Sequence, residues 1–462
     1  MSSNPIRGVA LCLLLSGCAV ALKDAPEQDK VLDDALPDST EVRAEWAAPA
    51  DDAGLVDDGW LASFNDDQLN ALVAETLNKQ NPNLRILSAQ VDRAEASVRA
   101  AAAARKPTVG VGAGLSGTGG APEVEQQSAA GGFGVSWEAD VWGRIKAGAN
   151  AADENLRATT ADFQYARQSL VANVAKSWYL ATELSLQVAL TEELIQILEE
   201  TVSLVETKEE VGQVTMQDVY LVRADLNSAR EAKETAVGGQ QQARRALEIL
   251  LGRYPAGEIE TATELVPVPP PIPVGLPSEL LERRPDLIAA ERRVASAFFI
   301  TEQARLAKLP RFGLNTAAGV SSGVSGLIGN LGAGVVAPLY TGGALEAQLD
   351  IATADQQAAI GAYGAAVLNA FEEVEAGLTN SELLERRKTY LGGAVDNNLG
   401  AYELAIVQFD VGQTDLLSVL QIQSRWVGAR VGLLNVKNQQ LAERINLHLA
   451  LGGSFEESND EE

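Results

Sequence analysis

Residues 107–117 read PTVGVGAGLSG, and residues 132–142 read GFGVSWEADVW. In both stretches an apolar residue alternates with glycine, serine or an acid, which is the period of a β-strand with two unlike faces. Residues 311–321 (RFGLNTAAGVS) and 331–340 (LGAGVVAPLY) repeat the pattern. A tilted strand needs about nine to eleven residues to cross a bilayer. We therefore expect four membrane-spanning strands, rather than a sheet covering a soluble core, near 108–116, 132–142, 311–320 and 330–340.

Four strands of one chain cannot cross a membrane as an open sheet. Each unpaired edge amide or carbonyl in hydrocarbon would cost several kcal/mol. Two copies would close an eight-stranded barrel nearly filled by side chains, whereas three copies would make twelve strands and leave a bore. The strand pattern therefore predicts an oligomer, and a channel favours more than two chains.

Long helices are predicted between the strand pairs. Residues 149–211 contain neither glycine nor proline, and at about 1.5 Å per residue they would form a helix approaching 100 Å. That length indicates a coiled-coil or helical-barrel setting, with residues 215–251 returning antiparallel and Gly212 supplying the turn. The second long run, 344–409, contains six glycines, which either allow close packing or mark a broken stretch.

The chain is internally duplicated. Val211-Gly212-Gln213 recurs as Val411-Gly412-Gln413, and residues 81–107 align with residues 284–310. Two matches at nearly the same offset indicate a repeated unit of about two hundred residues. We expect a first repeat over 60–252, a proline-rich extended connector over 253–278, a second repeat over 279–451 and an acidic disordered tail over 452–462.

The N-terminus has the marks of an export signal. A basic residue, an apolar run and the sequence Leu-Ser-Gly-Cys at residues 15–18 resemble a bacterial lipobox. We expect a signal peptide over 1–17, a lipid attached to Cys18 and an N-terminal tether over 18–59. The alternative is an ordinary signal peptide that carries an incidental cysteine.

Composition excludes several classes of protein. The formal net charge of −27 argues against a nucleic-acid partner, which would need basic patches. Both cysteines lie within the first eighteen of the 462 residues, and His448 is the only histidine, so no metal site or other cofactor is expected. No nucleophile–base pair stands at a recognisable spacing, so an enzyme is not expected.

Five stretches, in order, resemble the TolC-like outer-membrane efflux family in its lipoprotein branch: Trp60–Leu77, Trp137–Leu156, Glu282–Val294, Ala337–Gln348 and Asn369–Leu378. The resemblance implies an α/β membrane protein of the Gram-negative outer membrane. It would be a homotrimer, in which a twelve-stranded transmembrane β-barrel continues into a long periplasmic α-helical barrel. It would act as a passive duct for small molecules, fed by an inner-membrane pump, most often of the proton-driven RND type, through a periplasmic adaptor protein.

The same resemblance assigns roles to the hairpin tips. The segments Val211-Gly212-Gln213 and Val411-Gly412-Gln413 would contact the adaptor, and Asp218 would face the pore aperture. Many members carry a second acid nine residues after the second glycine, where Gln421 stands here. Asp415 follows that glycine by three residues, so the second acidic ring is absent or displaced, and Asp415 and Gln421 would be the aperture residues of the second tip.

The sequence also allows other interpretations. Asp218 could be an ordinary solvated helix acid, and Arg283-Arg284-Pro285-Asp286 is interpreted as a helix start with local ion pairs. The cargo could belong to type I protein secretion or metal-ion efflux instead of small-molecule efflux. A non-channel coiled-coil envelope lipoprotein would explain the helices but not the four strands.

Overall fold

The computed structural model describes residues 22–37, 40, 42–49, 58–78, 81–120, 123–322 and 324–456. The chain divides into two compact units. The first comprises Met1–Asp38, Gln90–Thr160 and Ala289–Gly364, and the second comprises Ser39–Ala89, Ala161–Ile288 and Ala365–Glu462.

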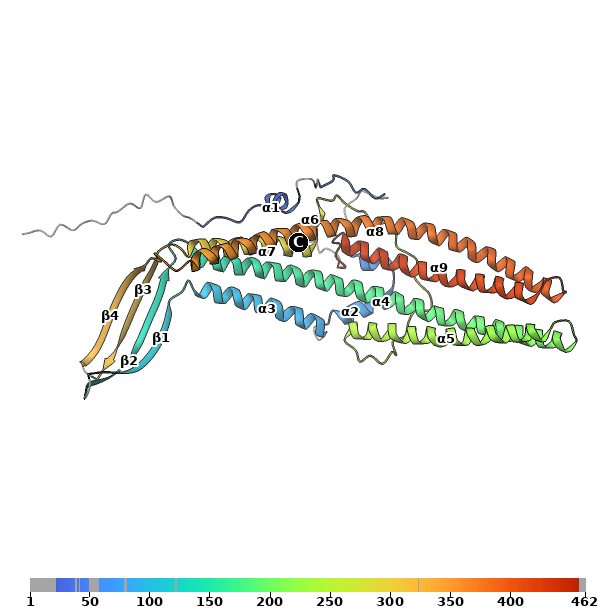
Figure 1. Cartoon of the computed structure of the whole chain (residues 1–462), viewed down its shortest axis with the longest axis horizontal. Coiled ribbons are helices and arrows are strands. Elements are labelled where there is room, and N and C mark those ends of the chain that lie inside the picture. The colour runs from blue at the N-terminus through green and yellow to red at the C-terminus, as the bar shows by residue number, and fades with distance from the viewer. Residues whose placement is uncertain are drawn as a thin grey trace, which may run out of the picture. The chain divides into compact units, whose positions relative to one another are not determined.

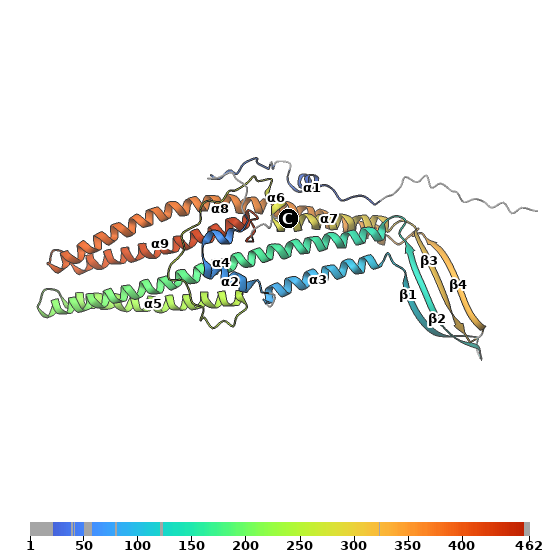
Figure 2. The same ribbon diagram turned by 180° about the vertical axis from the view of Figure 1, so that it is seen from behind.

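The first unit contains an antiparallel sheet of four strands in the order β1-β2-β3-β4. The strands lie side by side in the views of Figures 1 and 2. Their bounds are β1 (Thr108–Gly120), β2 (Glu123–Ala139), β3 (Arg311–Ser321) and β4 (Val324–Val336). Each repeat therefore contributes one β-hairpin, and the two hairpins join through the pairing of β2 with β3.

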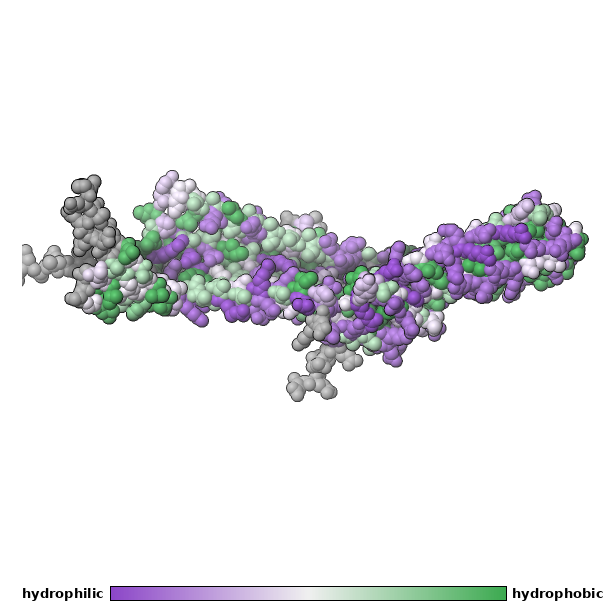
Figure 3. Space-filling view, turned by 90° about the horizontal axis from the view of Figure 1, so that it is seen from below, coloured by the Kyte–Doolittle hydropathy of each residue, from purple (hydrophilic) through white to green (hydrophobic). Residues whose placement is uncertain are grey.

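The register separates an apolar face from a polar face. Val109 pairs with Val135, which pairs with Thr316, so these residues share one face. The opposite face carries Thr108, Ser136, Asn315 and Gly332 in successive pairings. On the apolar face the exposed fraction reaches 90% at Val111 and 85% at Leu331. Figure 3 shows apolar residues in green over the sheet. A face so apolar and so exposed needs a lipid or protein environment.

Two strands begin earlier than their alternation predicts. β2 starts at Glu123 rather than near 132, and β4 starts at Val324 rather than near 330. The glycine- and serine-rich residues that look like turns continue the hydrogen-bonded ladder. β2 also ends earlier, because the Asp140 carboxylate accepts the backbone N–H groups of Ile145 (3.0 Å) and Lys146 (2.8 Å) at the start of the next helix.

Helices make up most of the remaining structure. Their bounds are α1 (Gln28–Ala35), the 3₁₀ helix η1 (Trp60–Phe64), α2 (Asp67–Thr76), α3 (Pro82–Ala103), α4 (Arg144–Glu210), α5 (Met216–Leu251), α6 (Leu280–Arg283), α7 (Pro285–Leu306), α8 (Ala344–Asp410) and α9 (Leu416–Ala450). No helix in the described ranges is long and apolar enough to cross a bilayer. The proline-rich connector between α5 and α6 contains neither helix nor strand.

Two helical hairpins, α4–α5 and α8–α9, belong mainly to the second unit. α8 runs unbroken for 67 residues, so its glycines do not interrupt the helix. At Gly364 a side chain would meet the backbone oxygen of Ala35, whereas at Gly392 the surrounding space is open. The hairpins pack on each other near their tips through a shared apolar core: Leu198, Val205, Val219, Val222, Leu226, Ala229, Ala405, Phe409, Leu416, Val419 and Leu420.

Both hairpins turn through the same backbone motif. Gly212 has φ +74° and Gly412 has φ +76°, in the left-handed region that favours glycine. The N–H of Gln213 donates to the Lys208 carbonyl (2.8 Å), and that of Gln413 donates to the Gln408 carbonyl (2.7 Å). These six-residue hydrogen bonds close a Schellman motif at each helix end. The predicted role of Gly212 as the turn is confirmed.

A second apolar core joins η1 and α2 to the C-terminal end of the chain. Trp60, Phe64 and Trp178 pack with Phe455, which is buried. The backbone N–H of Gly59 donates to the Ser454 carbonyl at 2.8 Å. The predicted start of the disordered tail at residue 452 is therefore too early, because apolar contacts order residues 452–456. The rest of that tail lies outside the described residues.

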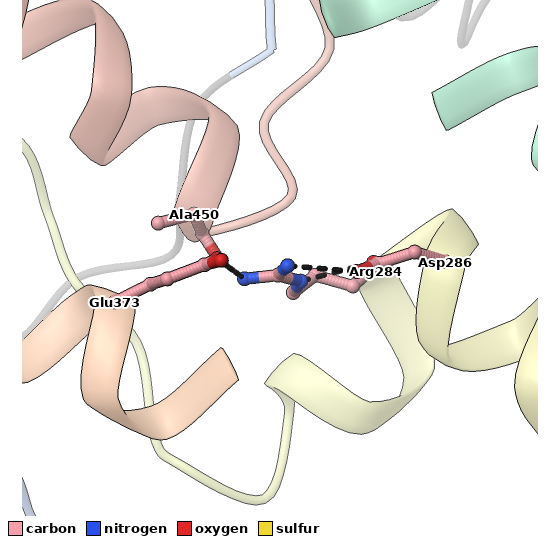
Figure 4. Close-up of polar contacts among 4 residues, drawn as sticks. All are labelled: Arg284, Asp286, Glu373 and Ala450. Atoms are coloured by element: carbon pink, nitrogen blue, oxygen red, sulfur yellow. Dashed lines mark hydrogen bonds and ion pairs between the residues drawn. The ribbon is translucent and has the colours of Figure 1, made fainter. Parts of the chain in front are cut away.

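The buried side chain of Arg284 joins three helices (Figure 4). Its guanidinium donates to both oxygens of Asp286 (3.0 and 2.7 Å), to Glu373 Oε2 (2.6 Å) and to the carbonyl of Ala450 (3.2 Å). Burial opposes the charge, but the hydrogen bonds and charges of Asp286 and Glu373 outweigh it and raise the pKa of Arg284. The interpretation of this cluster as structural agrees with the contacts, since Pro285 opens α7.

Replacing Arg284 is expected to weaken this junction severely. Arg284→Met leaves the partly exposed carboxylates of Asp286 and Glu373 without their cation, which should destabilise the fold by about 2–3 kcal/mol. Arg283→Met is the matched control: Arg283 is more exposed and its guanidinium lies 3.7 Å from Asp58, so its loss should cost no more than about 1 kcal/mol. Urea unfolding followed by circular dichroism measures both. Equal midpoints for the two variants would contradict this role of Arg284.

The tip glycines should resist substitution where a helix glycine does not. Gly212→Ala forces a β-carbon into the left-handed region and should cost about 1 kcal/mol, which speeds local amide exchange roughly fivefold. Gly392→Ala, inside α8 and in open space, should instead stabilise its helix. Hydrogen exchange resolved by peptide distinguishes the two. Unchanged exchange around residue 212 in Gly212→Ala would show that the turn does not depend on glycine.

Candidate functional site at the hairpin tips

Asp218 lies in the first turn of α5, just after the first tip. Its Oδ2 accepts hydrogen bonds from the Thr215 backbone N–H and from Thr215 Oγ1, both at 2.8 Å. The side chain thus reaches back to the residue that caps the helix, as the acid of a capping box does. Asp218 is half-buried, and its negative charge also complements the helix N-terminus. This residue therefore stabilises the tip, and its predicted place at a pore aperture remains a prediction.

The second tip uses an acid at a different position. Asp415 is itself the N-cap of α9, and its Oδ1 accepts the backbone N–H of Ser418 at 2.7 Å. Hydrogen bonds from Ser418, first from the backbone N–H and then from the side chain, lower the pKa of the Asp415 carboxyl. Gln421, in the second turn of α9, is exposed. Where one tip has a capping Thr and an acid three residues later, the other has a capping Asp and a Ser.

An ion pair missed by the sequence analysis joins the two tips. Lys208 on α4 is buried and donates through Nζ to the carbonyl of Asp410, the last residue of α8, at 2.8 Å. The same Nζ lies 3.3 Å from Asp410 Oδ1 and 5.4 Å from the centre of the Phe409 ring. A cation at a helix C-terminus is favourable, and burial strengthens the attraction. The one signal was a lysine among acids in the sequence ETKEEV.

A second connection lies further from the tips. Arg430 on α9 makes a bidentate pair with Glu193 on α4, at 2.8 and 2.9 Å. Its guanidinium also lies 4.8 Å from the Trp426 ring, which stacks on Tyr402 at 5.5 Å. The hydrogen bonds from Arg430 outweigh burial and lower the pKa of the Glu193 carboxyl. The two hairpins are thus joined by charge as well as by their apolar core.

Apolar side chains stand exposed around both turns. The predicted adaptor contacts Gln213 and Gln413 are exposed, and the glycines beside them have open space. The exposed apolar residues of the tips are Val211, Met216, Tyr220, Val411 and Leu417. Such a surface suits contact with another protein better than contact with water.

Within the described segments, no three His, Cys, Asp or Glu side chains are grouped so that they could hold a metal ion. His448 is buried and stacks on Trp60 at 5.5 Å. Burial, helped by the charge of Arg444, lowers the pKa of His448 to about 3, so this histidine is neutral at physiological pH.

Comparison with known proteins gives the family. The model of the outer membrane efflux protein family matches residues 73–253 and 276–453 of this chain. The chain is 29% identical to the pyoverdine export outer membrane protein OpmQ of Pseudomonas aeruginosa, over 99% of this chain and 98% of the relative. It is 28% identical to the toluene efflux pump outer membrane protein TtgC of Pseudomonas putida, over 88% and 87%.

Solved structures share the fold. The outer-membrane channel OprN superposes with a TM-score of 0.82 at 24% identity, over 91% of this chain and 99% of that one. CusC, which forms a transmembrane channel, superposes with a TM-score of 0.81 at 25% identity, over 91% of this chain and 99% of that one. The predicted fold class is thereby confirmed. The chain belongs to the outer membrane efflux protein family, whose members are channel proteins of the outer membrane and not enzymes.

Proposed function

We propose that three copies of this chain form the exit duct of a tripartite efflux system. The observation that carries the proposal is the four-stranded sheet, which has one apolar face and two edges, on β1 and β4, that pair with no other strand among the described residues. In a bilayer those edges require partners, and copies of the same sheet supply them. Twelve strands leave an open bore, whereas eight would be nearly filled by side chains.

The hairpin tips are the proposed docking end. Their exposed apolar residues and their open glycines would receive a periplasmic adaptor protein, which connects the duct to an inner-membrane pump of the RND type. The duct holds no energy source of its own, so the pump drives transport. We propose small organic molecules as cargo, because relatives of this chain are named for pyoverdine export and toluene efflux. Type I protein secretion and metal-ion efflux are the alternatives.

Channel formation is the direct test. The purified protein should insert into a planar bilayer as a trimer and produce discrete conductance steps. Chemical cross-linking of the same sample should give a species of three chains. A folded protein that stays monomeric and does not conduct would rule out the duct and favour a non-channel envelope lipoprotein.

The aperture role of Asp218 can be separated from its capping role. Asp218→Asn removes the charge but keeps a side-chain oxygen that can accept from Thr215, so channel block by multivalent cations should weaken while the hairpin stays stable. Asp218→Ala should also cost about 1 kcal/mol of helix stability. Glu234→Gln, at an exposed acid further along α5, is the matched single-charge control. If block is the same in Asp218→Asn as in the wild type, Asp218 is a capping residue only.

We also propose that Cys18 carries the lipid anchor. Cys18 lies outside the described residues, but Leu22 lies against Gly143, just after β2: a β-carbon on Gly143 would be 3.2 Å from the Leu22 β-carbon. Four residues reach at most about 14 Å, so a lipid on Cys18 would stay close to the end of the membrane-spanning sheet.

Substituting the cysteine tests the anchor. Cys18→Ser should abolish labelling of the protein by radioactive or clickable fatty acid in cells. Channel conductance of the purified variant should persist, because the strands are unchanged. Label that remains on Cys18→Ser would show that the lipobox assignment is wrong.

A further inference from the structure

Two basic residues stand at the start of β1 and β3 in a chain whose net charge is −27. Lys106 comes two residues before β1, and Arg311 is the first residue of β3. Both are exposed, and neither makes a salt bridge to any carboxylate in the described part of the chain. Two cations without a salt bridge, separated by one strand, are unexpected in a protein this acidic.

Both side chains line one cavity on the polar face of the sheet. The cavity has a volume of about 630 Å³ and is lined also by Thr108, Ser136 and Asn315. Thr108 Oγ1 lies 2.7 Å from Ser136 Oγ, and a β-carbon on Gly332 would collide with Asn315, so these polar groups share the face that carries the glycines. In a transmembrane barrel the polar face looks into the lumen.

The nearest acids are already neutralised or engaged. Glu138 also lines the cavity, but its Oε1 accepts from Arg144 at 2.9 Å. The Asp140 carboxylate accepts the first backbone N–H groups of α4. Neither carboxylate is therefore paired with Lys106 or Arg311.

Strand spacing brings the two cations within reach of one ligand. β2 alone separates β1 from β3, and continuing their register sets Lys106 level with Gly313, two residues from Arg311. The backbones of Lys106 and Arg311 therefore lie roughly 12 Å apart, and both side chains are long. A guanidinium presents a planar pair of donors that matches a carboxylate or phosphate, and an ammonium adds a point charge. The hydroxyls of Thr108 and Ser136 are further donors on the same face.

We propose that Lys106 and Arg311 form a basic belt inside the barrel, at the end nearest the helices, that binds the carboxylate or phosphate groups of anionic solutes. The proposal rests on the proposed trimeric duct, in which three copies close the belt around the lumen. An acidic duct repels anions, and the belt gives them one attractive site on their path. The sites at the hairpin tips are separate from it.

The ion selectivity of the channel tests whether the basic belt binds anions. Wild-type trimers and the double variant Lys106→Gln/Arg311→Gln are inserted into bilayers of neutral phosphatidylcholine, and the reversal potential is recorded in a KCl gradient. The ratio of chloride to potassium permeability should fall by roughly twofold or more in the double variant, and block by added citrate should weaken by a similar factor. The charge-preserving variant Lys106→Arg/Arg311→Lys should keep most of both properties.

Controls separate the belt from general charge effects. Arg85→Gln/Arg245→Gln removes the same charge from exposed residues of the other compact unit and should leave selectivity unchanged. A wild-type reversal potential and citrate block in the belt variant would overturn the proposal, and so would an equal shift in the control. An effect seen only when anionic lipid is added would assign the residues to lipid headgroups instead. Absence of any wild-type channel would overturn the proposed duct itself.

Discussion

The unpaired backbone along β1 and β4 is the constraint on which the rest of this structure depends. In the described part of the chain each of these strands pairs on one side only. Water could satisfy the open amides and carbonyls, but hydrocarbon cannot. The apolar face that the register creates favours a membrane environment for the sheet. In that environment the open edges of β1 and β4 lack hydrogen-bond partners. Further copies of the sheet pair with both edges and close a barrel whose apolar face lies against lipid.

Glycine lets the sheet take its geometry. At Gly132 a β-carbon would lie 2.5 Å from the Ala318 carbonyl oxygen, and its partner Gly319 is equally crowded by the backbone of β2. The central strands therefore approach more closely there than any other residue would allow. At Gly110 and Gly112 nothing crowds the site, so glycine there keeps the inner face free of side chains. Glycine thus has two roles in this sheet: it allows the close approach of strands, and it leaves the inner face unobstructed.

The sequence indicates those features that depend on local pattern and conceals those that depend on distant partners. Alternation predicts all four strands, and the repeated Val-Gly-Gln predicts both turns, because each rests on neighbouring residues. The early starts of β2 and β4 could not be predicted, since residues suited to a polar inner face are also residues suited to turns. Nor could the unbroken α8: close packing against Ala35 accounts for Gly364, but Gly392 stands in open space and the helix still continues through it.

The duplicated tips show how a repeat can diverge without losing its fold. Both need a polar side chain to satisfy the free N–H groups of the returning helix. Asp218 does so from the third helical position, where it is half-buried, whereas Asp415 does so from the cap itself, where it is exposed. Either position lets the acid accept a backbone N–H group, but the negative charge is not in the same place. The capping acid can therefore stand at either of two positions three residues apart. The electrostatic potential at the tip differs between the two repeats because the negative charge differs in position.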